Sequence, residues 1–164
     1  MSRERMAEQI RQLKKEKNAM IFAHYYQIPE VQDIADLVGD SLELARNVAK
    51  VDADIVIFCG VYFMGESAKI LAPNKKILVP VVDAQCPMAS MVTGEQLKKF
   101  RSENPETPIV CYVNSSAEVK AQSDICCTSS NALRIAQNIE SDRFLFVPDQ
   151  NLGSYIQSQI PEKN

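Results

Sequence analysis

The chain has 164 residues, of which 46% are hydrophobic and 24% charged, with a formal net charge of −3. This length fits one ordinary domain or two small ones, and the net charge argues against a dedicated nucleic-acid-binding protein, which usually carries a basic stripe. No stretch approaches the ~20 apolar residues that span a bilayer, and the N-terminus shows no apolar signal-peptide core. We therefore expect a cytoplasmic protein with no nucleic-acid or membrane partner.

Helix and strand patterns alternate along the chain. An amphipathic, basic segment within 1–18 predicts a solvated first helix. Short apolar runs then predict strands at 20–23, 55–59, 77–82, 109–113, 125–127 and 144–147. Helical patterns lie between them, at 30–37, 41–49, 66–71, 93–101, 117–121, 131–139 and 152–159. Fully apolar strands separated by helices indicate an α/β fold with parallel sheets covered on both faces.

The order of strands and helices over 20–86 is repeated over 109–153. The segment 123–126 (Ser-Asp-Ile-Cys) matches 53–56 (Ala-Asp-Ile-Val) in this comparison. A repeated βα unit predicts two small domains with a boundary near 88–92. We therefore predict an N-terminal helix over 1–18, a first αβα domain over 19–90 and a second over 91–164. Ser41 and Thr93 are expected to cap the helices that they precede.

The chain has five cysteines and no export signal, so we expect reduced thiols. Four of them lie in apolar runs and are expected to pack as small hydrophobic residues: Cys59, Cys111, Cys126 and Cys127. Cys86 follows the strand at 77–82 in a turn beside Pro87, where a thiol can serve metal or redox chemistry. No Cys-x-x-Cys pair occurs, which argues against a structural zinc site.

Polar side chains follow most of the predicted strands. His24, the only histidine, and Tyr26 follow the first strand. Gly60 follows the second, and further polar side chains follow later strands: Asp83, Cys86, Tyr112, Asn114, Thr128 and Ser129. Taken singly, each Ser or Thr is explained by helix capping, and His24 is explained by packing at a strand end. Together they indicate a pocket for a small polyanion such as a dicarboxylate or a phosphorylated sugar. No glycine-rich phosphate loop occurs, which disfavours a nucleotide.

Seven motifs run through the chain in order, at 23–27, 39–41, 59–69, 83–89, 112–114, 120–131 and 148–153. Together they resemble the quinolinate synthases, the iron–sulfur enzymes of NAD biosynthesis. The resemblance implies three pseudo-symmetric three-layer αβα domains around a central [4Fe–4S] cluster held by three cysteines. It also implies condensation of iminoaspartate with dihydroxyacetone phosphate to quinolinate, and L-aspartate oxidase as a supplier of iminoaspartate.

The resemblance also implies roles for individual residues. Cys86 matches the first cluster ligand, and His24 and Tyr26 match catalytic positions, with Tyr26 acting in proton transfer. The substrate-binding positions of the family match His24, Ser41, Tyr112, Asn114 and Ser129.

The chain departs from the family pattern in its cluster ligands. The second and third cluster cysteines and a His-x-Glu pair of the family lie beyond Asn164, Cys126 and Cys127 match neither, and Gln85 replaces a usual glycine. Because one thiolate cannot hold a cubane cluster, we expect an N-terminal portion without the third domain that is inactive alone. One alternative is a non-catalytic small-anion-binding α/β module that has lost the cluster. Another is a separate polypeptide that supplies the remaining cysteines.

Overall fold

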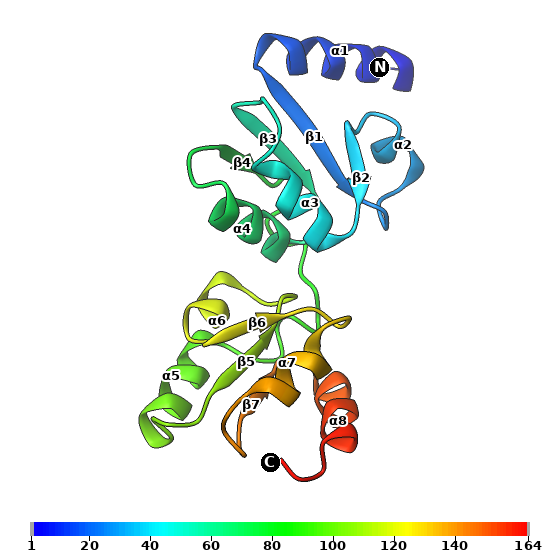
Figure 1. The fold of residues 1–164 in the computed structure, drawn as a ribbon. Helices are drawn as coiled ribbons and strands as arrows, with labels where there is room; N and C mark the ends of the chain where they lie inside the picture. Colours follow the sequence, from blue (N-terminus) through cyan, green and yellow to red (C-terminus); the bar gives the residue numbers. More distant parts are fainter. Residues whose placement is uncertain (1, 164) are drawn as a thin grey trace. The chain divides into compact units, whose positions relative to one another are not determined.

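The computed structural model describes residues 2–163 and divides the chain into two compact units, Met1–Gln85 and Cys86–Asn164. Each unit contains a small parallel sheet with helices packed on it (Figure 1). The predicted α/β class with repeated αβα layers is therefore confirmed.

The first unit is built on a four-stranded sheet. Its elements are α1 (Arg3–Glu16), β1 (Ala19–His24), α2 (Pro29–Gln32), β2 (Leu37–Gly39), α3 (Ser41–Val48), β3 (Ile55–Cys59), α4 (Tyr62–Leu71) and β4 (Lys76–Leu78). All neighbouring strands are parallel, in the order β2-β1-β3-β4. Phe22 and Phe58 are fully buried in its core, with ring centroids 6.3 Å apart in an edge-to-face arrangement. The apolar runs of β1 and β3 thus form the centre of the sheet.

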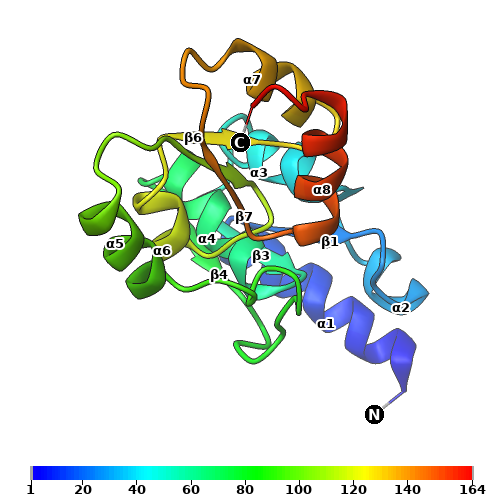
Figure 2. The ribbon, with the colours of Figure 1, turned by 90° about the horizontal axis from the view of Figure 1, so that it is seen from below.

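The second unit is a three-layer sandwich around a three-stranded sheet. Its elements are α5 (Gly94–Glu103), β5 (Ile109–Tyr112), α6 (Ala117–Ala121), β6 (Ile125–Cys127), α7 (Ala132–Asn138), β7 (Leu145–Val147) and α8 (Gln150–Gln159). The strand order is β6-β5-β7, all parallel. Leu97 and Val119 pack with Cys111 on one face, while Ala132 and Ile156 pack with Val110 on the other. Figure 2 shows the helix pairs α5–α6 and α7–α8 on opposite sides of this sheet.

The same pattern of hydrogen bonds to the backbone occurs in both units. Equivalent residues of the two units are separated along the sequence by the same distance as Ile21 and Ile109. In the first unit, Asp36 N donates to Ile21 O (2.8 Å) and Ile21 N donates to Asp36 Oδ2 (2.7 Å). In the second unit, Asp124 N donates to Ile109 O (2.9 Å) and Ile109 N donates to Asp124 Oδ2 (2.7 Å). Asp36, and not Asp54, therefore corresponds to Asp124, and the predicted matching of the two repeats was wrong.

This mismatch arose because β2 was missed. Residues 30–37 were predicted to be one helix, but α2 ends at Gln32 and β2 begins at Leu37. A three-residue strand is too short to show a periodic pattern. The strand predicted at 77–82 is also shorter, because β4 ends at Leu78, just before Pro80, whose lack of an N–H disfavours a continued ladder. Helix α4 begins at Tyr62, ahead of the predicted start at 66.

The predicted caps had mixed outcomes. Thr93 and Gln96 form the predicted capping box of α5. Asp40, and not Ser41, caps α3, because its Oδ1 accepts hydrogen bonds from Leu42 N (2.9 Å) and Glu43 N (2.8 Å). Ser41 is instead the first residue of the helix.

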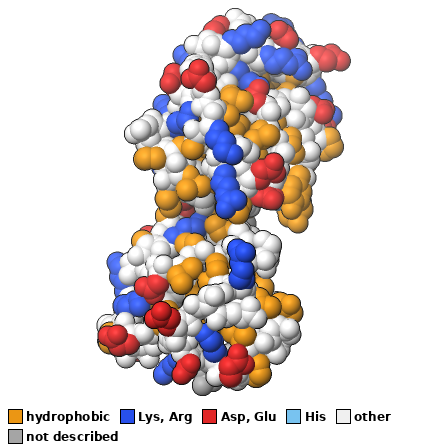
Figure 3. Space-filling model, in the orientation of Figure 1, with side chains coloured by type: hydrophobic (Ala, Val, Ile, Leu, Met, Phe, Trp, Pro, Cys, Tyr) orange, Lys and Arg blue, Asp and Glu red, His pale blue; other side chains and the backbone are white. Residues whose placement is uncertain are grey.

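The surface of both units is mixed in character. On the face drawn in Figure 3, side chains of both charge signs lie on each unit. The first unit also has a groove of about 360 Å³ between α1 and the sheet, which includes the exposed apolar side chains of Leu13 and Leu78. Among residues 2–163, no helix is long and apolar enough to cross a membrane.

Candidate functional site

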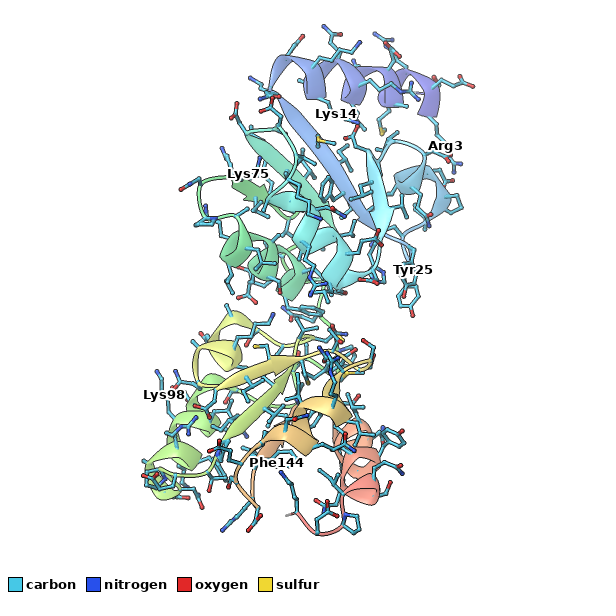
Figure 4. All side chains as sticks on the ribbon, in the orientation of Figure 1. Arg3, Lys14, Tyr25, Lys75, Lys98 and Phe144 are labelled. Carbon is cyan, nitrogen blue, oxygen red and sulfur yellow. The ribbon has the colours of Figure 1, made fainter. Side chains whose placement is uncertain are left out.

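His24 ends β1 and lies within a cluster of aromatic rings. Its centroid is 4.4 Å from that of Tyr25, in a stacked arrangement, and 4.6 Å from that of Tyr26, in an edge-on arrangement. Tyr25 is labelled in Figure 4, where it projects from the end of β1. His24 Nδ1 accepts a hydrogen bond from Tyr26 N at 3.1 Å, so the proton of the neutral imidazole lies on Nε2. The side chain therefore offers a donor at Nε2.

The surroundings of His24 favour its neutral form. Burial lowers the pKa of His24, and the nearby charge of Asp40 offsets part of this effect by raising it. Gly60 follows β3 directly, at the same edge of the sheet. A Cβ at this position would lie 2.8 Å from Met64 Sδ and 3.7 Å from His24 Cβ. The first unit thus presents a neutral imidazole at the carboxyl edge of its sheet.

Ser41 lies at the same edge of the first unit. It follows Gly39, the register partner of His24, and Tyr25 N donates to Gly39 O at 3.2 Å, which holds the two strand ends together. Ser41 is half-buried at the first position of α3. The structure therefore places Ser41 beside the strand end that carries His24 and Tyr26.

In the second unit, Tyr112 ends β5, and Ser129 follows its register partner Cys127 at the end of β6. Burial raises the pKa of Tyr112, the hydrogen bond with the Ser129 side chain acts in the opposite direction, and the charges of Asp149, Cys127 and Cys86 raise it further. Tyr112 is consequently a protonated donor near neutral pH. The structure thus brings Tyr112 and Ser129 together.

Asn114 and Asp149 lie at the same edge of the second sheet. Asn114 follows β5 and is half-buried. Asp149 follows β7, caps α8 through hydrogen bonds from Asn151 N and Leu152 N, and acts electrostatically on Tyr112. Asp40 and Asp149 were not predicted as site residues. An acidic residue between a strand and a helix is a recognisable N-cap, which was the available signal.

Cys86 is half-buried in the turn at the start of the second unit. Its carbonyl oxygen accepts hydrogen bonds from Ser90 N and Ser90 Oγ, both at 3.2 Å. Within residues 2–163, no group of three or more His, Cys, Asp or Glu side chains is placed to hold a metal ion. A cluster held by three cysteines needs more thiolates than Cys86 provides, so this part of the chain does not fit the group by itself.

The other cysteines are also free thiols. Cys111 and Cys127 are buried and Cys59 is half-buried, as packing in a strand predicts. Cys126 is exposed, so its predicted burial was wrong. It lies on β6, an edge strand of the second sheet, which leaves one side of its backbone and side chain uncovered.

The repeat relates the site residues of the two units to one another. Tyr25 N donates to Gly39 O, and Val113 N donates to Cys127 O in the same way. At this offset His24 corresponds to Tyr112, Tyr26 to Asn114 and Ser41 to Ser129. Each unit therefore presents neutral imidazole, phenol, amide or hydroxyl groups at the same two strand ends, and such groups can donate hydrogen bonds to an anion.

Comparison with known proteins agrees with this arrangement. The family model described as "Quinolinate synthetase A protein" matches residues 8–164. The chain is 61% identical over 163 residues to a quinolinate synthase of Alkaliphilus metalliredigens, covering 99% of this chain and 54% of the relative. It is 55% identical over 163 residues to one of Dehalococcoides mccartyi strain CBDB1, with the same coverage, and 56% identical over 156 residues to one of Clostridium perfringens strain 13, covering 95% of this chain and 52% of the relative. The chain spans about half the length of the curated relatives it matches. It belongs to the quinolinate synthetase A protein family.

Proposed function

We propose that the chain supplies substrate-binding groups of a quinolinate synthase, which condenses iminoaspartate with dihydroxyacetone phosphate to quinolinate. The observation that carries this proposal is the equivalence of His24 with Tyr112 and of Ser41 with Ser129, which places hydrogen-bond donors at the same two strand ends of each unit. Both substrates are anions, and neutral donors at strand ends suit them. L-aspartate oxidase is the proposed source of iminoaspartate.

In the first unit, we assign the binding of anionic oxygens to His24 and Ser41. The neutral imidazole donates from Nε2, since Nδ1 is occupied by Tyr26 N. The Ser41 hydroxyl adds a second donor at the adjacent strand end. Tyr26 is 82% exposed, so its phenol can reach a bound substrate and transfer a proton.

In the second unit, we assign substrate binding to Tyr112, Asn114 and Ser129. The raised pKa of Tyr112 keeps its phenol protonated, so that it donates to a carboxylate or phosphate oxygen. The Ser129 hydroxyl follows β6 and adds a donor at the neighbouring strand end. The Asn114 amide follows β5 and adds donors at the same edge.

We further propose that Cys86 is one ligand of a [4Fe–4S] cluster. The remaining ligands would come from the part of the family that this chain does not span, because no group of three or more possible metal ligands occurs within residues 2–163. We therefore expect no quinolinate synthesis from this chain alone.

The test combines this chain with the remaining segment of the Alkaliphilus metalliredigens relative under anaerobic iron–sulfur reconstitution. We expect quinolinate to form only when both segments are present. His24→Ala and Tyr26→Phe should reduce turnover while leaving the visible absorbance of the cluster, and Cys86→Ala should abolish that absorbance. Tyr155→Phe, on α8 with 54% of the residue exposed, is the matched control for Tyr26→Phe. Normal turnover of either His24→Ala or Tyr26→Phe would contradict their roles.

A non-catalytic anion-binding module is the second candidate, and the hydrogen-bond donors repeated at the strand ends of both units are the observation that favours it. Calorimetry of this chain with malate, phosphate and dihydroxyacetone phosphate separates the two functions. Binding by the chain alone, together with no quinolinate after addition of the remaining segment, would support the module and contradict the enzyme.

A further inference from the structure

Two cysteines of the second unit face one another across neighbouring strands. Cys111 on β5 and Cys126 on β6 are register partners in the parallel pair. Residues paired in this way point to the same face of a sheet, and neighbouring strands lie about 4.8 Å apart. This spacing falls within the roughly 4.4–6.8 Å between Cα atoms that a disulfide requires.

The two thiols differ in access to solvent. Cys111 is buried among Leu97, Ile109 and Val119, while Cys126 is exposed on the edge strand. An oxidant from solvent therefore meets Cys126 first, and Cys111 lies directly behind it in the sheet. This arrangement of an accessible thiol and a neighbouring resolving thiol is typical of redox-active pairs.

The surroundings also favour one thiolate in the pair. The hydrogen bond from Cys126 lowers the pKa of Cys111, burial acts against this, and Ser115, Ser123 and the charge of Lys120 lower it further. The pKa of Cys126 is raised, first because of its hydrogen bond to Cys111. The charge of the pair therefore lies on Cys111, and Cys126 becomes a thiolate when it passes its proton to Cys111.

We propose that Cys111 and Cys126 are a thiol–disulfide exchange site that a small-molecule disulfide converts to an intramolecular disulfide. The Cys126 thiolate attacks one sulfur of the oxidant, which forms a mixed disulfide and releases one thiol. The Cys111 thiolate then attacks Cys126 Sγ, forms the Cys111–Cys126 bond and releases the second thiol. The cysteine pair gives up two electrons and two protons, and the oxidant becomes two thiols.

The neighbouring thiol Cys127 provides a built-in control. It follows Cys126 directly but packs in the cluster on the opposite face of the sheet, with Val110 and Ala136. Alternation along the strand thus points it away from Cys111. The link lies one residue before Tyr112 on β5, so the redox state of the pair acts on a strand end that carries a proposed substrate-binding phenol.

The test is mass spectrometry of the reduced chain after incubation with oxidised glutathione and alkylation of the remaining thiols. Trypsin cleaves after Arg101, Lys120 and Arg134, so Cys111 and Cys126 lie on separate peptides, 102–120 and 121–134. We expect these two peptides to be joined, with Cys59, Cys86 and Cys127 alkylated.

Three variants complete the test. Cys126→Ser changes an exposed side chain and should abolish the link, as should Cys111→Ser, whereas Cys127→Ser should retain it. A disulfide within peptide 121–134, or a glutathione adduct that persists on Cys126 in the unaltered chain, would overturn the proposal. These outcomes do not depend on quinolinate synthesis, so they are independent of the proposed function.

Discussion

Asp124→Ala should destabilise the second unit, because it removes the hydrogen-bond acceptor of one buried backbone N–H. Asp124 Oδ2 accepts hydrogen bonds from Ile109 N at 2.7 Å and from Arg101 Nη2 at 2.6 Å. Ile109 is fully buried, so alanine leaves its N–H without this acceptor, which costs about 2 kcal/mol. The ion pair adds ~0–1 kcal/mol, since the Arg101 and Asp124 side chains are 31% and 45% exposed. A loss of about 2 kcal/mol corresponds to a roughly 30-fold larger fraction of the opened state.

Hydrogen exchange followed by mass spectrometry measures this change in each unit separately. We expect exchange in β5 and its neighbours to be roughly 30-fold faster in Asp124→Ala, with the first unit as an unchanged internal reference. Asp36→Ala should speed exchange in β1 and its neighbours and leave the second unit unchanged, because Asp36 Oδ2 accepts a hydrogen bond from Ile21 N. Glu106→Gln, an exposed acid after α5, is the control. An exchange rate in β5 within about threefold of this control would refute the reasoning.

The pH dependence of this effect has a definite sign. Burial acts to raise the pKa of Asp124, but the hydrogen bonds from Arg101 and Ile109 N and the Arg101 charge outweigh it, so the pKa in the folded chain is lowered. A carboxylate whose pKa is lowered on folding stabilises the fold above the unfolded pKa of about 3.9, and this stabilisation disappears as the pH falls through the folded pKa. The difference in free energy of unfolding between the unaltered chain and Asp124→Ala should therefore become smaller in acid.

Two further predictions follow from the first unit and its repeat. The only histidine gives a single imidazole signal in an NMR titration, and Asp40→Asn should move the midpoint of His24 further down, because the Asp40 charge raises its pKa; an unchanged or higher midpoint would contradict this. Gly65→Ala should destabilise the chain by ~1–3 kcal/mol in thermal unfolding, since the new Cβ would lie 2.4 Å from Val79 Cγ2. The equivalent Gly153→Ala places its Cβ 3.3 Å from a Phe146 ring carbon. It should destabilise the chain less, because this contact is looser and alanine favours the helix. Equal losses in the two glycine variants would show that this close contact does not decide stability.

The class of the fold followed from local patterns, because buried parallel strands need apolar runs and the helices between them need caps. The capping box at Thr93 and the strands at β1, β3 and β5 are examples. Strand β2 escaped prediction because its pairing depends on Asp36, which bonds to Ile21 across the sheet. No periodic pattern within three residues carries that information.

The sequence by itself determined which chemical groups follow the strands: an imidazole at His24, phenols at Tyr26 and Tyr112, and a thiol at Cys86. Only the tertiary structure decided how these groups are paired. The register of parallel strands brings together residues distant in sequence. It places Tyr112 beside the strand end that leads to Ser129, and Cys111 opposite Cys126. Register depends on contacts between strands, and a strand read alone contains no record of its partner. Burial in the folded chain then lowers the pKa of His24 and raises that of Tyr112.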